Sequence, residues 1–139
     1  MKAGEAVGPE LQPGESLLQA EVMYVLDVKY RAAGMAVVAV TDRYLRVIEG
    51  YNRVLTGDTG RVLGDFYEIT RIKERHLIPL HRIAAVTVRE MGFRQLPYFD
   101  IQVDAGPSWR LRATRKNARD QALADSLIRT LHAAIDALH

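Results

Sequence analysis

The sequence predicts a mainly β protein of the α+β class, an antiparallel barrel of about seven strands capped by one C-terminal amphipathic helix. Two observations point to this class. Short segments rich in Val, Ile and aromatic residues recur up to residue 113, and Gly, Pro or Asp residues separate them. Beyond that point apolar residues recur every three or four positions, as they do on one side of a helix.

The composition is typical of one globular domain. The 139 residues are 48% hydrophobic and 26% charged, which lies within the range of folded domains of this length. The net charge of +2 is too small for a protein that binds nucleic acid through a basic face. We therefore expect no nucleic-acid partner.

Cysteine usage and hydropathy limit the compartment. The sequence has no cysteine, which excludes a disulfide framework, a thiolate metal site and a cysteine nucleophile. No window approaches the roughly 18 apolar residues that a membrane span needs, and the N-terminal residues lack the apolar centre of a signal peptide. We expect a cytoplasmic protein, either free or attached peripherally to a membrane.

The N-terminal residues 1–12 hold Gly, Pro and small residues without a period, and we expect a flexible tail there. A single domain would then span residues 13–139. Its first strand is predicted over residues 18–30, where apolar and polar residues alternate. Met23 and Val25 interrupt the polar face, so the middle of this strand should be covered on both sides.

The first hairpin is the clearest local signal. After a turn at residues 31–34, the second strand is predicted at residues 35–41 and the third at 44–49. The polar turn Thr41-Asp42-Arg43 joins them, because Asp and Thr tolerate turn geometry that Val and Ile avoid.

Residues 51–75 are predicted to form an inserted β-arm after the third strand. A short phrase, Arg-Val-Leu, occurs on both sides of a Gly-Asp-Thr-Gly turn at residues 57–60. Phe66–Lys73 reads as a strand of its own. The arm is too apolar for a free loop, which makes it the candidate interaction surface, with these residues: Arg53, Val54, Leu55, Arg61, Val62, Leu63, Phe66 and Tyr67.

Four shorter strands are expected after the arm, at residues 76–80, 85–90, 98–103 and 109–113. Pro79 has no N–H for a sheet, so it indicates an edge strand or a strand end. In the last pair, the outward Arg110 and Arg112 are expected to face Asp100 or Asp104.

The C-terminal helix is predicted over residues 115–138, with Thr114 as the N-cap. Lys116 and Asp120 interrupt its apolar side, so the first turns are expected to extend beyond the barrel. The apolar side that should lie on the core consists of Leu123, Leu127, Leu131, Ala134, Ile135 and Leu138.

Four segments together resemble the bacterial pleckstrin-homology-like (PH/GRAM-type) domains. They are Leu-Gln-Pro-Gly-Glu at 11–15, Val-Ala-Val-Thr-Asp-Arg-Tyr-Leu at 38–45, Ile-Pro-Leu at 78–80 followed by Ile83 and Val86, and Phe-Asp-Ile-Gln-Val at 99–103. The resemblance implies a helix-capped barrel that binds a ligand or a partner and has no catalytic activity.

The chain departs from that family in three respects. Its arm is longer than the usual connection, and Trp109 lies in the last strand instead of the helix. Lipid-binding members carry basic residues that open the second strand, whereas here Lys29 and Arg31 are followed by small and apolar residues. The resemblance therefore does not predict specific binding of inositol phosphates.

Two short patterns suggest catalysis or metal binding. Asp58-Thr59-Gly60 matches the triplet of retropepsin-like aspartic proteases, but its flanking residues do not, and a glycine turn explains the same residues. His76 and His81, with Glu74 nearby, are five positions apart across a proline and fit no common face. We expect no metal site, no cofactor and no enzyme activity, and a retropepsin-like aspartic protease that uses Asp58 is a remote alternative.

The expected function is that of a binding module for a protein partner or a second copy, acting through the arm. The alternative is peripheral binding of anionic lipid, or of another phosphate-bearing ligand, through a basic patch. The candidate anion-binding residues are Arg71, Lys73 and Arg75, with Arg53 and Arg61 on the arm.

Overall fold

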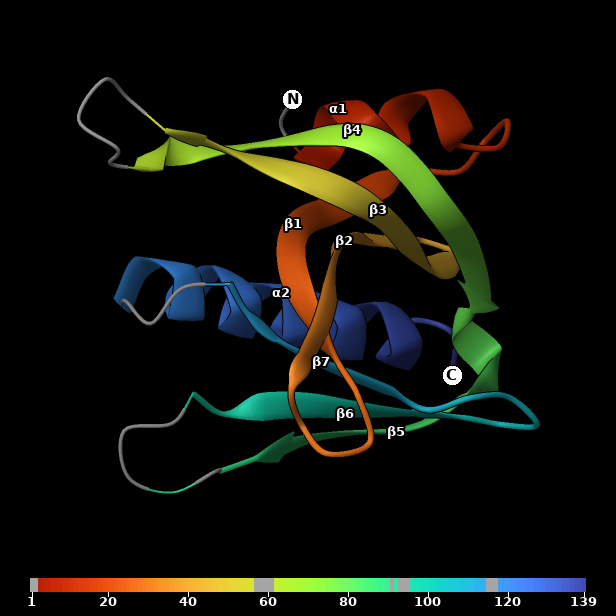
Figure 1. Cartoon of the computed structure of the whole chain (residues 1–139). Coiled ribbons are helices and arrows are strands. Elements are labelled where there is room, and N and C mark those ends of the chain that lie inside the picture. The colour runs from red at the N-terminus through yellow and green to blue at the C-terminus, as the bar shows by residue number, and fades with distance from the viewer. Residues whose placement is uncertain (1–2, 57–61, 91, 93–95, 115–117) are drawn as a thin grey trace.

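The computed structural model describes residues 3–56, 62–90, 92, 96–114 and 118–139, and for residues 51–56 and 62–71 it describes the backbone only. Within these ranges, seven antiparallel strands form one sheet (Figure 1). They are β1 (Leu17–Leu26), β2 (Ala32–Thr41), β3 (Tyr44–Thr56), β4 (Val62–Pro79), β5 (Ile83–Arg89), β6 (Tyr98–Val103) and β7 (Trp109–Ala113).

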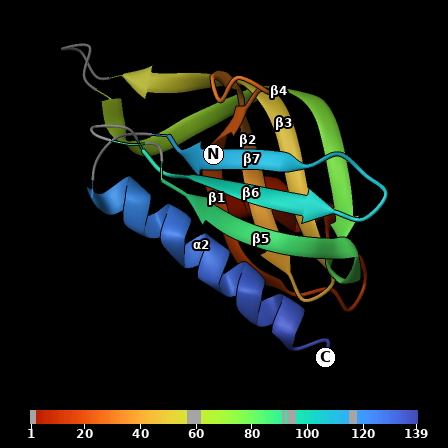
Figure 2. The same cartoon turned by 90° about the horizontal axis from the view of Figure 1, so that it is seen from below.

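The strand order in the sheet is β4-β3-β2-β1-β7-β6-β5, so β4 and β5 are its two edges. The short 3-10 helix η2 (Leu80–Arg82) connects these edge strands. The sheet bends strongly, and Figures 1 and 2 show β5–β7 as a layer across from β3 and β4. The predicted class is thus confirmed, in the form of an open and curved seven-stranded sheet.

The helix α2 (Ala118–Asp136) covers the open side of this sheet (Figure 2). Leu127, Leu131 and Ala134 are buried in the main core, as the sequence predicts. Two details differ. Leu138 lies beyond the helix and is 49% exposed, and Asp120 is buried although the first turn was expected to extend into solvent. Thr114 is described, whereas residues 115–117 lie outside the described ranges.

The main core fills the concave side of the sheet. Inward residues of consecutive strands alternate with outward ones, so Ala36, Val38 and Val40 of β2 face the core together with Leu45 and Val47 of β3. These side chains pack against the apolar side of α2. Burial of apolar surface of this kind is the main favourable term in folding.

A second apolar cluster lies on the convex side of the sheet and corrects the prediction of a flexible tail. Residues 3–10 form the helix α1 (Ala3–Val7) and the 3-10 helix η1 (Gly8–Glu10). Val7 is fully buried against Val37, Ala39 and Ile48, the outward residues of β2 and β3. Residues 3–10 pack on the sheet because they cover apolar residues that the sheet cannot bury by itself.

Strand β1 is shorter than predicted because Asp27 ends it. The Asp27 carboxylate accepts hydrogen bonds from the backbone N–H groups of Lys29 (2.8 Å) and Arg31 (3.0 Å), and Tyr30 adopts a positive φ of 62°. The turn therefore lies at residues 27–31, and β2 begins at Ala32. These hydrogen bonds lower the pKa of Asp27, the Arg31 N–H contributing most.

The middle of β1 is covered on both faces, as predicted from Met23 and Val25. Met23 belongs to the main core and Val25 packs against it. Ala20 and Val22 pack on the second cluster, beside α1. The side chain of Gln19 reaches α2, where the hydroxyl of Thr130 lies 2.7 Å from its amide group.

The predicted arm is the continuation of β3 and β4. The two strands pair antiparallel along their whole length, from Tyr44 opposite Pro79 to Thr56 opposite Val62, with register shifts on the way. The strands predicted separately at 66–73 and 76–80 are therefore one strand of 18 residues. Pro79 is its last residue and β4 is an edge strand, so both interpretations of that proline hold.

Candidate interaction edge and its polar clusters

The candidate site is built on the free edge formed by β4. Within the described ranges β4 pairs with β3 and with no second strand, so one side of its backbone has no strand partner. Ile72 and Leu77 of β4 are 36% and 45% exposed, which is high for large apolar side chains. An edge of this length with apolar side chains is a template for a further strand.

The arm adds a second unpaired edge. Pairing of β3 with β2 begins at Met35 opposite Gly50 and runs toward Leu45, whereas pairing of β3 with β4 continues to Thr56. Among the described residues, the segment 51–56 and its partner strand thus form a two-stranded ribbon beyond the sheet (Figure 1). An isolated two-stranded ribbon is only marginally stable in water.

Most of the candidate interaction residues lie on this ribbon as backbone positions. Arg61 and the Asp58-Thr59-Gly60 triplet lie outside the described residues, and the side chains of the others are not described. The predicted interaction residues that fall within β3 or β4 are Arg53, Val54, Leu55, Val62, Leu63, Phe66 and Tyr67.

The three candidate anion-binding residues have different environments. The side chain of Arg71 lies outside the described residues, and Lys73 is exposed. Arg75 is also exposed, but its guanidinium forms an ion pair with Glu10 of η1. Arg75 is thus already engaged in holding the N-terminal segment beside β4.

A cluster that the sequence did not predict lies on the concave side at the base of the ribbon. Glu49 of β3 is directly opposite Glu74 of β4, and His76 is two residues further along β4. The Nε2 atom of His76 is 2.7 Å from an Oε2 of Glu49 and 3.6 Å from an Oε2 of Glu74. The histidine ring also meets the ring of Trp109 edge-on, at 4.5 Å between centroids.

The spacing of Glu74 and His76 was a usable signal for this cluster. Residues two positions apart on a strand point to the same face of the sheet, so Glu74 and His76 lie on one face. His81, the neighbouring histidine in the sequence, lies exposed on η2 and is not part of the cluster. Glu49 could be added only by knowing the register between β3 and β4.

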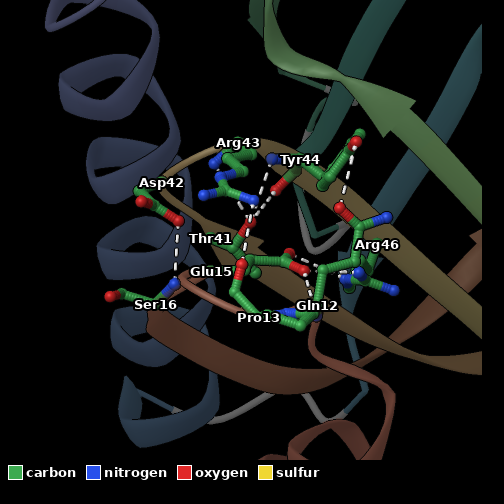
Figure 3. Close-up of polar contacts among 9 residues, drawn as sticks. All are labelled: Gln12, Pro13, Glu15, Ser16, Thr41, Asp42, Arg43, Tyr44 and Arg46. Atoms are coloured by element: carbon green, nitrogen blue, oxygen red, sulfur yellow. Dashed lines mark hydrogen bonds and ion pairs between the residues drawn. The ribbon is translucent and has the colours of Figure 1, made fainter.

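A buried ion pair fixes the N-terminal segment to the first hairpin (Figure 3). Arg46 donates to both carboxylate oxygens of Glu15, at 2.9 and 2.5 Å, and Gln12 N–H donates to the same carboxylate at 2.9 Å. The hydrogen bond from Arg46 lowers the pKa of Glu15 to about 2, although burial opposes this shift. The contacts are internal, which makes the pair a structural element.

The turn of the hairpin is held by the same segment. The Thr41 hydroxyl accepts from the N–H groups of Arg43 (3.2 Å) and Tyr44 (2.9 Å), and the Asp42 carboxylate accepts from Ser16 N–H at 2.8 Å (Figure 3). Arg43 donates to the Pro13 carbonyl at 3.3 Å. Two of the four segments that carry the family resemblance, 11–15 and 38–45, therefore contact each other.

One finding concerns membranes. Among the described helices, none is both long enough and apolar enough to cross a bilayer.

Comparisons with known proteins agree with this architecture. No model of a protein family and no curated protein sequence matches the chain. Among solved structures, the hSac2 domain from the human phosphoinositide phosphatase Sac2 superposes with a TM-score of 0.68 at 9% identity, covering 97% of this chain and 79% of that chain. A pleckstrin homology domain from Shewanella amazonensis SB2B superposes with a TM-score of 0.51 at 14% identity, covering 91% of this chain and 92% of that chain.

At sequence identities this low, a structural likeness shows a shared fold and does not identify a ligand. The strand order, the C-terminal helix and these two superpositions agree with the four sequence segments named above. The chain has a pleckstrin-homology-like fold.

Proposed function

We propose that this pleckstrin-homology-like domain is a non-catalytic binding module that pairs the free edge of β4, and the β3–β4 ribbon, with a strand of a protein. The observation that carries the proposal is the 18-residue edge strand whose outer side has no strand partner among the described residues. Main-chain hydrogen bonds along such an edge supply affinity, and neighbouring side chains supply selectivity.

A second copy of the chain is the first partner to test. An antiparallel edge can pair with its own copy across a two-fold axis, because each strand then presents the same residues to the other. Ile72 and Leu77 would become buried in such a contact. The ribbon would also gain a third strand, which isolated hairpins need for stability.

The test replaces apolar residues of the edge by lysine, a residue that blocks edge pairing. We expect the wild-type chain to show a concentration-dependent mass above 15.6 kDa in light scattering, and Ile72→Lys with Leu77→Lys to remain monomeric. Val88→Lys is the matched control, because Val88 is 52% exposed on β5, the opposite edge. It should assemble like the wild type.

A second measurement, native mass spectrometry of the protein purified gently from its host, reports both the copy number and any other protein that stays bound. A wild-type chain that is monomeric at high concentration and carries no protein partner would contradict the proposal. So would equal assembly of the wild type and the double lysine variant.

Binding to anionic membranes is the second candidate, and the exposed ammonium of Lys73 favours it. It is the weaker candidate because Arg75 is already paired with Glu10. It predicts vesicle binding that weakens as salt rises and that Arg71→Glu with Lys73→Glu abolishes. Absence of binding to anionic vesicles at low salt would eliminate it.

A further inference from the structure

The cluster at the base of the ribbon has a composition that differs from its surroundings. Inward positions of β2 and β3 are apolar from Ala36 to Val40 and from Leu45 to Val47, and Glu49 is the next inward position of β3. Glu74 and His76 occupy the matching positions of β4. Two carboxylates and an imidazole thus lie together on the face that otherwise forms the core.

The register between β3 and β4 places two carboxylates opposite each other. Glu49 and Glu74 are directly opposite in the antiparallel pair, an arrangement that destabilises a sheet when nothing offsets it. The register then shifts, because Gly50 pairs with Ile72, which leaves Lys73 as an additional residue in β4. Such bulges change the direction of a side chain and occur often beside functional sites.

The three side chains converge on one point. One ligand atom from each of Glu49, Glu74 and His76 lies within 4.8 Å of the other two. Ligands of a tetrahedral ion with bonds of 2.0–2.1 Å are about 3.3 Å apart. His76 Nε2 is 3.6 Å from Glu74 Oε2, close to that spacing, and 2.7 Å from Glu49 Oε2, a hydrogen bond that an ion would replace. The side chains of His76 and Glu49 are 22% and 23% exposed and that of Glu74 is 61% exposed, so an ion can reach the cluster from solvent.

We propose that Glu49, Glu74 and His76 form a binding site for a divalent transition-metal ion of the Zn²⁺ class. An imidazole nitrogen suits Zn²⁺, whereas Ca²⁺ and Mg²⁺ take oxygen ligands. Three protein ligands leave the fourth position to water. The ion offsets the opposed carboxylates and ties β3 to β4 where their ladder shifts, and Trp109 limits the rotation of the His76 ring.

The experiment is a calorimetric titration of the untagged 139-residue chain with ZnCl₂, with CaCl₂ as the comparison ion. We expect one Zn²⁺ per chain, and an affinity for Ca²⁺ at least tenfold weaker. Glu49→Gln, Glu74→Gln and His76→Gln should each weaken Zn²⁺ binding at least tenfold. His81→Gln is the matched control, since His81 is exposed on η2, and it should bind Zn²⁺ like the wild type.

Substitution of the less exposed Glu49 or His76 can also disturb folding. Glu74→Gln avoids this problem, because the side chain of Glu74 is 61% exposed. Loading with Co²⁺ gives a second measurement, a visible absorption band that should be lost in Glu74→Gln and retained in His81→Gln. Failure of the wild type to bind at millimolar Zn²⁺ would overturn the proposal. Unchanged Zn²⁺ affinity in folded Glu74→Gln would also overturn it.

Discussion

At the residue scale, the buried Glu15–Arg46 pair connects the N-terminal segment to the sheet. Glu15 is 8% exposed and Arg46 is 9% exposed. Removal of one member of such a pair leaves a buried charge without its partner, which typically costs about 3–5 kcal/mol. The pair is therefore expected to matter more to stability than the exposed ion pairs of this chain.

Truncation of Arg46 should be strongly destabilising. We expect Arg46→Ala to lower the free energy of unfolding in urea by about 3–5 kcal/mol, because the Glu15 carboxylate loses both hydrogen bonds from the guanidinium. Arg31→Ala is the control, since Arg31 forms an exposed pair with Asp27 and should cost less than about 1 kcal/mol. Similar losses in the two variants would contradict the structural role of the buried pair.

The same pair predicts how stability depends on pH. The pKa of Glu15 falls from 4.5 to about 2 on folding, so the folded state favours the ionised carboxylate. A carboxyl group whose pKa falls on folding contributes stability that is fully present above pH 4.5 and is lost as the pH falls toward 2. The contribution at neutral pH is on the order of 3 kcal/mol, since a tenfold difference in the acid dissociation constant between the folded and unfolded states corresponds to about 1.4 kcal/mol.

Urea denaturation of the wild type and of Glu15→Gln between pH 2 and 7 measures this contribution. The difference in unfolding free energy between the two proteins should shrink on acidification below pH 4.5. A difference that stays constant down to pH 2 would show that ionised Glu15 does not stabilise the fold.

At the element scale, α1 is the element that the sequence could not reveal. A five-residue helix has little stability by itself, because helix nucleation is unfavourable. Its sequence, Ala-Gly-Glu-Ala-Val, is too short to show an amphipathic period. It exists because Val7 fits over Val37, Ala39 and Ile48, which is information about tertiary packing.

Substitution in α1 tests that packing. We expect Val7→Ala to lower the free energy of unfolding by about 2 kcal/mol, from lost apolar burial and the cavity that remains. Val28→Ala is the matched control, since Val28 is 81% exposed and should change stability by less than about 0.5 kcal/mol. Equal effects in chemical denaturation would mean that α1 does not pack on the sheet in solution.

Other elements were predictable because their signal is local. The alternation in β6 and the polar turn at Thr41-Asp42-Arg43 depend on residues close in sequence, and the structure places a strand and a turn there. The turn between β1 and β2 was predicted at residues 31–34 and lies at 27–31. That prediction was wrong because hydrogen bonds to the Asp27 side chain end β1 early. The Glu49–Glu74–His76 cluster depends on the register of two strands, including a bulge, which local patterns do not determine.

At the scale of the whole molecule, the ribbon extends beyond the rest of the sheet. Among the described residues, β3 pairs with β2 only as far as Gly50, whereas its pairing with β4 continues to Thr56. Removal of the ribbon should therefore leave the fold intact while removing part of the proposed interaction edge.

A shortened chain tests this separation. Arg53 pairs with Glu68, so residues 54–67 can be replaced by Asn-Gly, which favours a two-residue hairpin turn. We expect a circular dichroism spectrum and a thermal midpoint close to those of the wild type, together with weaker self-association in light scattering. Loss of the folded state would show that the ribbon is part of the folding unit.

The strand order also has a consequence for synthesis on the ribosome. Each pair of neighbouring strands is consecutive in sequence except β1–β7, where Met23 lies opposite Ala113. About 90 residues must therefore be made before β1 receives its second neighbour, and contacts this distant in sequence are slow to form. Until then, the β1–β4 part of the nascent sheet lacks both β7 and the helix that covers its concave side. Chaperone dependence should thus be greatest for chains stalled before residue 109.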